Sequence, residues 1–445
     1  MKLACIGPVS PLKTGISYFN EQFVPFLERH FTVETFTDRS IIPKASMPVR
    51  TPDIDAFLSD PRRFDAVLYH MGNHYRFHRR TFEAILRVPG FVLLHDCVLS
   101  HFFIKFYLER GNFLAFRKLC MTNFAAQSDS EISRFYAAKA DPYHFPMAGV
   151  LAMSSRGTIT MTDYGKSIVE REAPGAKVLR IHFPCFNPQP DACQTDLFRK
   201  KYQIPSDYFV VTSVGHMTPA KRLDVARDAF HKFHGRFPKS LFLLAGESSA
   251  RSPVSPHAQN DDSHTRNLGY LKRDEVEALM QLSDVCINLR FPTKGEMSLT
   301  LIEMMERGKV VAVSNHAQFA EFPDDACIKI DLGAHESDDL AGGLLEMATD
   351  ERRKKAMGDA AREFILMHHD PSSAAEDIAR FIRENAASEP FVTRETSHGF
   401  LDADPFPLRY KQALAYNVRR ILLYAREQGL NRVLKEGFRR AARRD

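Results

Sequence analysis

The sequence has no long hydrophobic run. No stretch of about 18 residues is free of charge, so we expect no segment that spans a membrane. The strand-like run at residues 2–7 soon becomes polar, and it is too short for the core of a signal peptide. No Cys-x-x-Cys pair occurs, and the seven cysteines are scattered, mostly within apolar runs. These absences predict a cytoplasmic protein whose cysteines are buried free thiols.

Two common nucleotide-binding motifs are also missing. The loop at residues 7–16 follows the first strand-like run but does not contain Gly-x-Gly-x-x-Gly, which disfavours a dinucleotide-binding oxidoreductase. The loop after the strand-like run at 208–215 lacks the second glycine and the Lys-Ser/Thr pair of a Walker loop. Tryptophan is absent too, but its absence excludes nothing.

The composition is that of an ordinary soluble globular protein. With 445 residues, 44% hydrophobic and 26% charged, the chain is long enough for two domains with separate cores. The net charge of +5 is uneven, because residues 409–445 hold eleven Lys and Arg against three acids, so this tail carries +8 and the remainder −3. Apolar residues recur in the tail at helical spacing. This pattern predicts an amphipathic helix that docks on the body or lies on anionic lipid.

The most informative stretch is 290–308. It follows a strand-like run and contains a polar loop and then an amphipathic helix that we expect to begin near Ser298. Backbone N–H groups and the helix dipole at Ser298 and Leu299 would hold a phosphate without a charged side chain. Glu296 and Glu303 flank this point and can accept hydrogen bonds from sugar and ribose hydroxyls. A purely structural role for both glutamates is the alternative.

A second candidate site follows the strand-like run that ends at Gly215. Thr218 is expected to cap a helix, which would place Lys221 and Arg222 in its first turn. Cations are unfavourable beside a helix N-terminus, so this pair favours a bound anion such as a nucleotide diphosphate. Solvated basic residues are the alternative.

In the first half of the chain, Gly15 and His95 are the candidate site residues. Gly15 lies in the loop after the first strand, where a glycine lets backbone N–H groups approach a ligand; a plain turn is the alternative. His95 follows a buried strand-like run, at the sheet edge where open α/β proteins bind ligands; a core histidine is the alternative.

Two other features of the first half have a structural interpretation. His70, His74 and His78 stand four residues apart, but Gly72 and Asn73 break the helix that a metal site would need. The aromatic residues of 99–150 have spacings typical of a helical core, although an acceptor could dock there.

Taken together, these motifs resemble those of the family-four retaining glycosyltransferases. Residues 14–18 are similar to the first loop of that family, 94–96 to the strand end near the donor sugar, and Gly215 with Lys221-Arg222 to its phosphate-binding loop. Residues 303–308 match the second half of its late glutamate motif. Gly295 stands where the first glutamate usually lies and Glu296 one place later, as in some bacterial members.

The resemblance covers residues 1–385 and implies the GT-B fold, an α/β architecture of two doubly wound Rossmann-like domains facing a cleft. We expect an acceptor domain at 1–187, a nucleotide-sugar domain at 188–387, and a linker with a helical tail at 388–445. The implied catalytic residues are His95, Lys221, Arg222 and Glu296. The implied donor-binding residues are Gly15, Ile16, Gly215, Ser298, Leu299 and Glu303.

The implied function is a metal-independent hexosyl transfer with retention, from a nucleotide diphosphate sugar to a glycan, lipid-linked or other acceptor. We expect no cofactor and no nucleic-acid partner, and a cytoplasmic location in which the 409–445 tail is free to contact anionic membrane. Two alternatives come from other classes. One is a non-catalytic GT-B scaffold, against which Lys221, Arg222 and Glu303 argue, and the other is a sugar-nucleotide epimerase.

Overall fold

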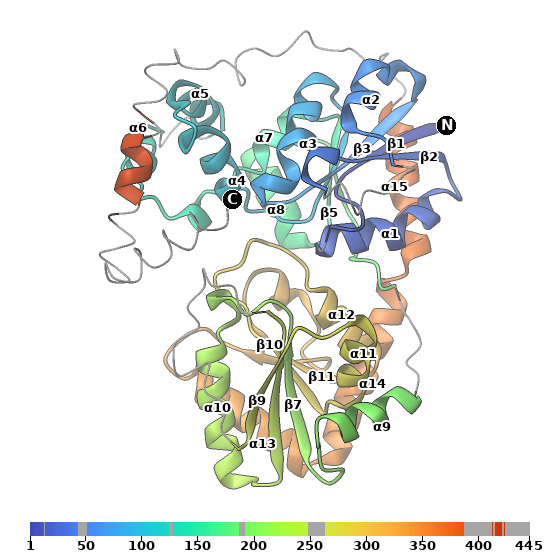
Figure 1. Cartoon of the computed structure of the whole chain (residues 1–445), viewed down its shortest axis with the longest axis vertical. Coiled ribbons are helices and arrows are strands. Elements are labelled where there is room, and N and C mark those ends of the chain that lie inside the picture. Colours follow the sequence, from blue (N-terminus) through green and yellow to red (C-terminus); the bar gives the residue numbers. More distant parts are fainter. Residues whose placement is uncertain are drawn as a thin grey trace. The chain divides into compact units, whose positions relative to one another are not determined.

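The computed structural model describes residues 1–12, 14–42, 51–123, 128–186, 192–247, 263–386, 412, 414–420 and 422. The chain divides into two compact units, each built around its own parallel sheet (Figure 1). The first unit comprises Met1–Ile181, Lys294–Glu296 and the described residues from Ala375 onward. The second comprises His182–Thr293 and Met297–Ala374.

The first unit contains a six-stranded sheet in the order β2-β1-β3-β4-β5-β6. All its strand pairs are parallel. Every residue of β3, β4 and β5 is buried, as expected for strands of a parallel sheet that helices cover on both faces. The strands are β1 Lys2–Ile6, β2 Thr32–Phe36, β3 Ala66–Met71, β4 Phe91–Leu94, β5 Gly157–Thr160 and β6 Val178–Arg180.

Helices α1 Gly15–Leu27, α2 Ile54–Ser59, α3 Tyr75–Arg87, α7 Gly149–Ser154 and α8 Asp163–Glu172 belong to this unit. Threonines cap two of them: the Thr14 side chain accepts from the Ser17 amide and the Thr162 side chain from the Gly165 amide. Residues of α15 Pro371–Ala386 from Ala375 onward also pack here. A Cβ at Gly157 would lie 2.7 Å from the Phe381 ring, so glycine is needed for that contact.

An aromatic-rich insertion lies between β4 and β5. It contains α4 Ser100–Phe103, the π-helical turn η4 Ile104–Leu108, α5 Phe113–Asn123 and α6 Ser128–Tyr136. The predicted role of its aromatic residues in the core is confirmed, because Phe102, Phe103, Phe106, Tyr107 and Phe116 are all buried.

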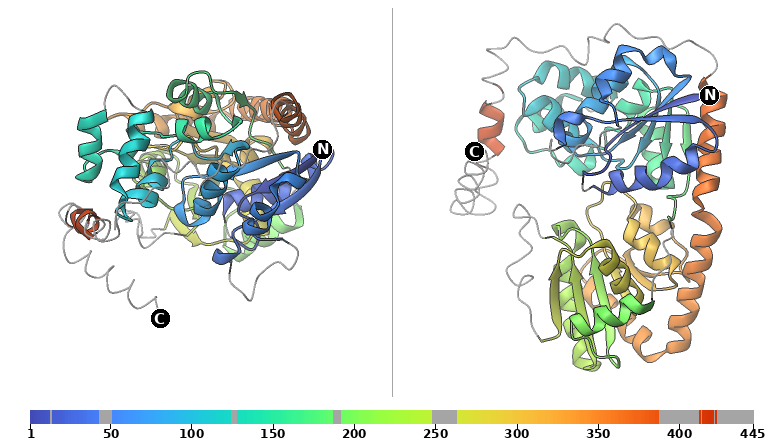
Figure 2. Two further views of the ribbon diagram at one scale, coloured as in Figure 1. Left: turned by 90° about the horizontal axis from the view of Figure 1, so that it is seen from above. Right: turned by 45° about the vertical axis from the view of Figure 1, so that its right-hand side comes forward.

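The described part of the tail, residues 414–420, is a short helical segment on the first unit (Figure 2). Tyr416 is buried against Phe113 at 6.0 Å between ring centroids, and the Asn417 side chain donates to the Glu109 carbonyl at 3.1 Å. Docking of the early tail is therefore confirmed at these residues. The predicted linker at 388–407 and the tail arginines from Arg426 onward lie outside the described residues.

The second unit repeats the architecture, with the strand order β12-β11-β10-β7-β8-β9 and only parallel pairs. Its strands are β7 Phe209–Val214, β8 Ser240–Ala245, β9 Thr265–Gly269, β10 Val285–Asn288, β11 Val310–Ser314 and β12 Ile328–Ile330. Its helices are α9 Ala192–Lys201, α10 Leu223–Arg236, α11 Arg273–Leu282, α12 Leu299–Glu306, α13 Glu336–Thr349 and α14 Glu351–His368.

Two doubly wound parallel sheets confirm the predicted fold class. Within the described residues, no helix is long and apolar enough to cross a membrane. The six cysteines that can be described are all buried and free, as predicted: Cys5, Cys97, Cys120, Cys185, Cys286 and Cys327.

Candidate active site

Each sheet has a point at which the chain order reverses, between β1 and β3 in the first sheet and between β7 and β10 in the second. Open α/β sheets bind ligands beside such points, at the carboxyl ends of the strands. Gly15 and Ile16 begin the helix that follows β1, and His95 directly follows β4. Gly215 directly follows β7, and Ser298 ends the loop after β10. The predicted residues therefore gather at the carboxyl edges of their own sheets.

The segment after β7 differs from the prediction. Pro219–Lys221 form a 3₁₀ turn, Arg222 adopts a left-handed conformation with φ 50° and ψ 43°, and α10 begins only at Leu223. The Thr218 side chain makes no capping hydrogen bond, so the predicted cap and the placement of the two cations in a first α-helical turn were wrong. The left-handed residue separates the 3₁₀ turn from α10, and the Lys221 side chain reaches the end of β7.

Lys221 is buried, and its ammonium group donates to the Val214 carbonyl oxygen. Burial lowers its pKa to about 7, and the nearby positive charge of Arg290 contributes in the same direction. Gly215 makes room for this arrangement: it has a φ of +110°, and a Cβ there would lie 3.0 Å from the Lys221 nitrogen. The strand end thus holds an ammonium group whose charge is readily gained or lost near neutral pH.

Two arginines lie at the same edge. The Arg222 guanidinium pairs with the buried Glu336 carboxylate of α13. Arg290 lies in the loop after β10, and its backbone amide donates to the Ser314 hydroxyl at 2.9 Å. The next amide, of Phe291, donates to the Ala220 carbonyl at 2.8 Å and so fastens this loop to the 3₁₀ turn. Lys221 and the two arginines thus gather three cationic groups at this edge, one of which, Arg222, is paired with a carboxylate.

Helix α12 begins at Leu299, as predicted, with Ser298 as its N-cap. The Ser298 hydroxyl accepts from the Leu301 amide at 3.4 Å and donates to the Asn288 side-chain oxygen at 3.1 Å. Because the first amides of a helix have no acceptor within the helix, this end can bind an anion.

The two glutamates of this stretch have different surroundings. Glu303 is fully buried, and its carboxylate forms a bidentate pair with Arg273 at 2.5 and 3.2 Å. Burial raises the pKa of Glu303, and the hydrogen bond from Arg273 opposes that rise. Glu296 is half-buried in the loop, where its carboxylate accepts from the Lys294 amide at 2.8 Å. Glu303 belongs to the second unit and Glu296 to the first.

In the first unit, His95 is part of a buried chain of hydrogen bonds. Its Nε2 lies 3.0 Å from His70 Nδ1, and His70 Nε2 lies 3.4 Å from the Cys5 sulfur. Burial lowers the pKa of His70 to about 3 and that of His95 well below its usual value, so both rings are neutral at physiological pH. Phe19 packs edge-on against His95 at 4.9 Å. The His95 Nδ1 has no hydrogen-bond partner within the described residues, and it is the atom left for a ligand.

Ile16 lies near the ends of β3 and β4. A Cβ at Gly72 would be 2.8 Å from its side chain and 2.9 Å from an Asp96 carboxylate oxygen, so a glycine allows these groups to meet. No heavy atom lies within 4 Å of the position of a Cβ at Gly15, which leaves space beside the loop. The helix break expected at Gly72-Asn73 is also present, because His70 lies in β3 and His78 lies in α3. The described residues contain no group of three His, Cys, Asp or Glu that could hold a metal ion.

Sequence reasoning missed four residues that interact with the predicted ones by hydrogen bonds, ion pairs or charge: His70, Arg273, Arg290 and Glu336. Arg273 is the first residue of α11, so the pattern used for Lys221, a cation at an expected helix N-terminus, could have identified it. His70 is a polar residue near the end of a buried strand, as is His95, so the same pattern marks both histidines. Nothing local marks Glu336 as a partner of Arg222.

Residues 194–364 match the family model described as glycosyl transferases group 1. We refer to this matched segment as the group 1 domain. It contains Gly215, Lys221, Arg222, Glu296, Ser298, Leu299 and Glu303. Gly15, Ile16 and His95 lie outside it, in the first unit.

Solved structures share the fold over most of this chain. One is HepE (Alr3699) of Anabaena in complex with UDP and glucose, with a TM-score of 0.60, 15% identity, and coverage of 86% of this chain and 100% of that chain. Another is the sucrose-phosphate synthase of Thermosynechococcus elongatus, with a TM-score of 0.59, 14% identity, and coverage of 86% and 98%. These likenesses confirm the GT-B fold.

A curated relative is the O-antigen biosynthesis glycosyltransferase WclY of Escherichia coli, which is 26% identical over 136 residues. The match covers 30% of this chain and 36% of that relative, so it spans about a third of the relative's length. Part of this chain is therefore similar in sequence to part of a glycosyltransferase of O-antigen biosynthesis.

Proposed function

We propose that this protein is a retaining glycosyltransferase of the hexosyltransferase type. It transfers a sugar from a nucleoside diphosphate sugar to a glycan, lipid-linked or other acceptor in polysaccharide biosynthesis. The observation that carries the proposal is the group of three cations, Lys221, Arg222 and Arg290, at the reversal point of the sheet in the group 1 domain. This is where an α/β sheet receives an anionic ligand.

The cations and the N-terminus of α12 stabilise the charge that develops on the leaving diphosphate. Lys221 is held at the strand end by the Val214 carbonyl, and an arriving diphosphate favours its protonated form. Arg222 exchanges part of its pairing with Glu336 for the phosphate, while the amides after Ser298 bind phosphate oxygens. Such preorganised electrostatic stabilisation is usually the largest single contribution to catalysis. No protein nucleophile is required, because the donor phosphate accepts the proton of the acceptor.

The remaining site residues bind the neutral parts of the substrates. Glu303 is proposed to accept from the ribose hydroxyls, with Arg273 holding its carboxylate in place. Glu296 and His95 are proposed to contact the donor sugar, and the loop at Gly15 and Ile16 the donor or acceptor. Because HepE was crystallised with UDP and with UDP-glucose, a uridine diphosphate sugar is the first donor to test.

We further propose that the reaction needs no metal ion and no cofactor. One Asp-x-Asp sequence, Asp53–Asp55, serves the backbone instead: the Asp53 carboxylate accepts from the amides of Asp55 and Arg39, both at 2.9 Å, and caps α2. The other, at residues 402–404, lies outside the described residues.

A two-step experiment tests the function. A thermal-shift screen of nucleotide sugars first selects the donor, and transfer is then measured as nucleoside diphosphate release with a set of glycan and lipid-linked acceptors. Nuclear magnetic resonance of the product should show the anomeric configuration of the donor, and a chelator should leave the rate unchanged. Inverted product contradicts retention, and a rate restored only by Mn²⁺ or Mg²⁺ contradicts metal independence. An epimerised sugar from donor alone indicates the epimerase, and donor binding without turnover the scaffold.

We also propose that the protein associates peripherally with the cytoplasmic face of a membrane through its tail. On the described tail residues Tyr416 is buried, whereas Leu414, Val418 and Leu422, spaced four apart, are exposed. The sequence that follows is rich in arginine, and each such charge near acidic lipid contributes about 1 kcal/mol. In a flotation assay the full chain should float with anionic vesicles at low salt and be released at high salt. No flotation would leave the tail with a structural role only.

A further inference from the structure

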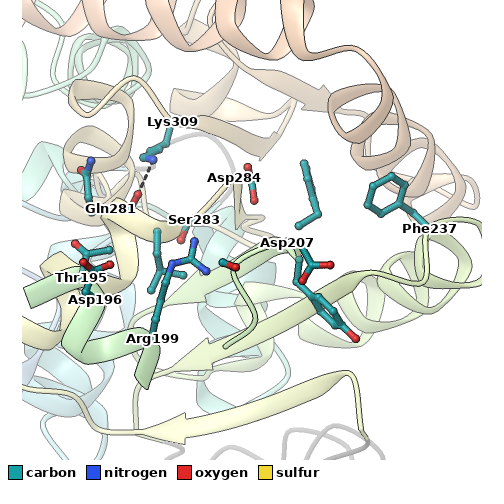
Figure 3. A pocket seen from close by; sticks show the side chains of 13 residues that line it. Thr195, Asp196, Arg199, Asp207, Phe237, Gln281, Ser283, Asp284 and Lys309 are labelled. Atoms are coloured by element: carbon teal, nitrogen blue, oxygen red, sulfur yellow. Dashed lines mark hydrogen bonds between the residues drawn. The ribbon is translucent and has the colours of Figure 1, made fainter. Parts of the chain in front are cut away.

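A cavity of about 670 Å³ opens at the other edge of the second sheet, where the strands begin (Figure 3). Tyr208 precedes β7, Asp284 precedes β10, and Lys309 precedes β11. Helix α9 supplies Thr195, Asp196 and Arg199 to the wall. Because β7 has six residues, at about 3.3 Å each, this cavity lies about 20 Å from the Gly215 edge. It is therefore a separate site from the proposed donor site.

Two of the three carboxylates in the wall already have cationic partners. Asp207 pairs with Lys239 at 2.7 Å. Asp284 pairs with Lys354 at 2.9 Å and also accepts from the Val210 amide at 2.8 Å. The third, Asp196, is exposed.

The two cations of the wall are in the opposite situation. Within the described residues, neither Arg199 nor Lys309 has a carboxylate partner; Arg199 donates to the Pro205 carbonyl at 3.1 Å and Lys309 to the Gln281 carbonyl at 2.6 Å. An ammonium group has three donors and a guanidinium five, so both keep donors for a ligand. Burial lowers the pKa of Lys309, and the positive charges of Lys354 and Arg199 add to this against the influence of Asp284. A bound anion would relieve this repulsion.

A third polar group lies beside the cations. The Thr195 hydroxyl oxygen is buried, and it has no hydrogen-bond partner within the part of the chain that the structure describes. A buried hydroxyl without a partner is unfavourable unless a ligand or water supplies one. Figure 3 shows Thr195, Arg199 and Lys309 on one side of the cavity and Phe237 on the other. The cavity thus combines a cationic, donor-rich side with an apolar one.

We propose that this cavity binds a small phosphorylated metabolite. Its phosphate group is held by Arg199, Lys309 and the Thr195 hydroxyl, and its organic part lies toward Phe237 and Tyr208. A volume of about 670 Å³ is far larger than a phosphate ion needs, and it falls within the range of roughly 300–1,000 Å³ typical of small-molecule sites.

Isothermal titration of the full-length protein tests this proposal with two probes, inorganic phosphate and a hexose 6-phosphate. We expect the hexose phosphate to bind more tightly. Arg199→Gln and Lys309→Gln should each weaken its binding about tenfold or more, the scale for losing a charge-assisted hydrogen bond. Asp196→Asn should tighten binding, because it removes a nearby negative charge. Arg222→Gln, at the opposite edge of the sheet, is the matched control and should leave the affinity unchanged.

Each contrary result overturns a defined part of the proposal. If no saturable binding occurs, or if only Arg222→Gln loses affinity, the proposed site is wrong. If the two probes bind with equal affinity, the proposal that the ligand has an organic part is wrong. Thermal unfolding verifies that each variant is folded; if Lys309→Gln is not, Arg199→Gln decides, because that side chain is only half-buried. The titration requires no transfer activity, so its outcome is independent of the proposed glycosyltransferase function.

Discussion

The carboxyl edges of the two sheets bury different kinds of polar side chain: neutral histidines at the first sheet, and charged side chains at the second. At the first sheet, His70 and His95 are buried, share a hydrogen bond and are neutral, since burial lowers the pKa of both. At the second sheet the polar side chains are charged, and buried carboxylates neutralise two of the arginines, in the pairs Arg222–Glu336 and Arg273–Glu303. Burying a charge is costly unless it is paired, and the histidines and these two arginines all avoid that cost.

Lys221 is the exception that makes the comparison informative. Within the described residues its ammonium group has a carbonyl oxygen as its partner and no carboxylate. Its lowered pKa, about 7, reflects that unfavourable position. A nucleoside diphosphate would complement the charge at this edge, whereas the neutral histidine edge suits an uncharged sugar or acceptor. The following predictions would break or sharpen this division.

Removing a cation from the second edge should have the largest effect. Lys221→Ala or Arg222→Ala should lower donor turnover by about 100-fold or more, the scale for losing one preorganised charge stabiliser. Steady-state rates at saturating donor measure this. Lys221→Met keeps the volume of the side chain and separates the charge from the packing, and thermal unfolding verifies the fold. Activity within a few-fold of wild type in these variants would remove both residues from the mechanism.

The two glutamates should then separate nucleotide recognition from sugar recognition. Glu303→Gln should weaken the binding of both the nucleoside diphosphate and the donor by about tenfold, whereas Glu296→Gln should weaken only the donor. Glutamine is preferred to alanine because it keeps the volume of the side chain and one oxygen that accepts a hydrogen bond from Arg273, whereas alanine would leave a cavity. Titration of both ligands into both variants gives the answer. Identical losses for the two ligands in each variant would contradict the assignment.

The features that the sequence predicted correctly are local ones. The buried strands followed by small or polar residues at Gly215 and His95, and the Ser298 cap of α12, follow from periodicity and from helix-capping chemistry. The wrong prediction at Lys221 is also local: a left-handed Arg222 is uncommon for a non-glycine residue, and nothing in the sequence marks it.

The features that could not be predicted depend on the order of the strands. His70 and His95 meet because β3 and β4 are neighbours, and Arg273 reaches Glu303 across 30 positions of sequence. The cavity at the amino edge is assembled from the starts of several strands and from α9, so no single motif announces it. Local sequence patterns predict where a strand ends, whereas predicting which strand ends meet requires the order of the strands in the sheet.

A smaller effect should appear in the pH dependence of nucleotide binding. Lys221 has a pKa of about 7 without ligand, and a bound diphosphate raises it, so binding near pH 8 should take up as much as one proton. Affinity should therefore fall by up to about tenfold per pH unit above pH 7. Calorimetry in buffers of different ionisation enthalpy measures the uptake directly. Proton uptake that persists in Lys221→Met would assign it to another group.

The smallest expected effect concerns the stability of the neutral edge. Folding lowers the pKa of His70 to about 3, so below the usual value of about 6.5 the unfolded chain binds a proton that the folded protein does not. The stability contribution of His70 is thus fully present above pH 6.5 and is lost as the pH falls toward 3, by at most about 1.4 kcal/mol per pH unit. Urea unfolding at pH 7.5, 6.5 and 5.5 avoids most carboxylate titration.

His70→Gln keeps a hydrogen-bonding side chain between Cys5 and His95 but cannot titrate. Its free energy of unfolding should fall less steeply than that of the wild type between pH 6.5 and 5.5, while the two proteins run parallel above pH 7. The buried His78, whose pKa is likewise lowered to about 3, provides the matched variant His78→Gln, which should change the slope by a similar amount. Equal slopes in the wild type and in both variants would mean that these histidines are not held neutral, and the contrast between the two sheet edges would fail.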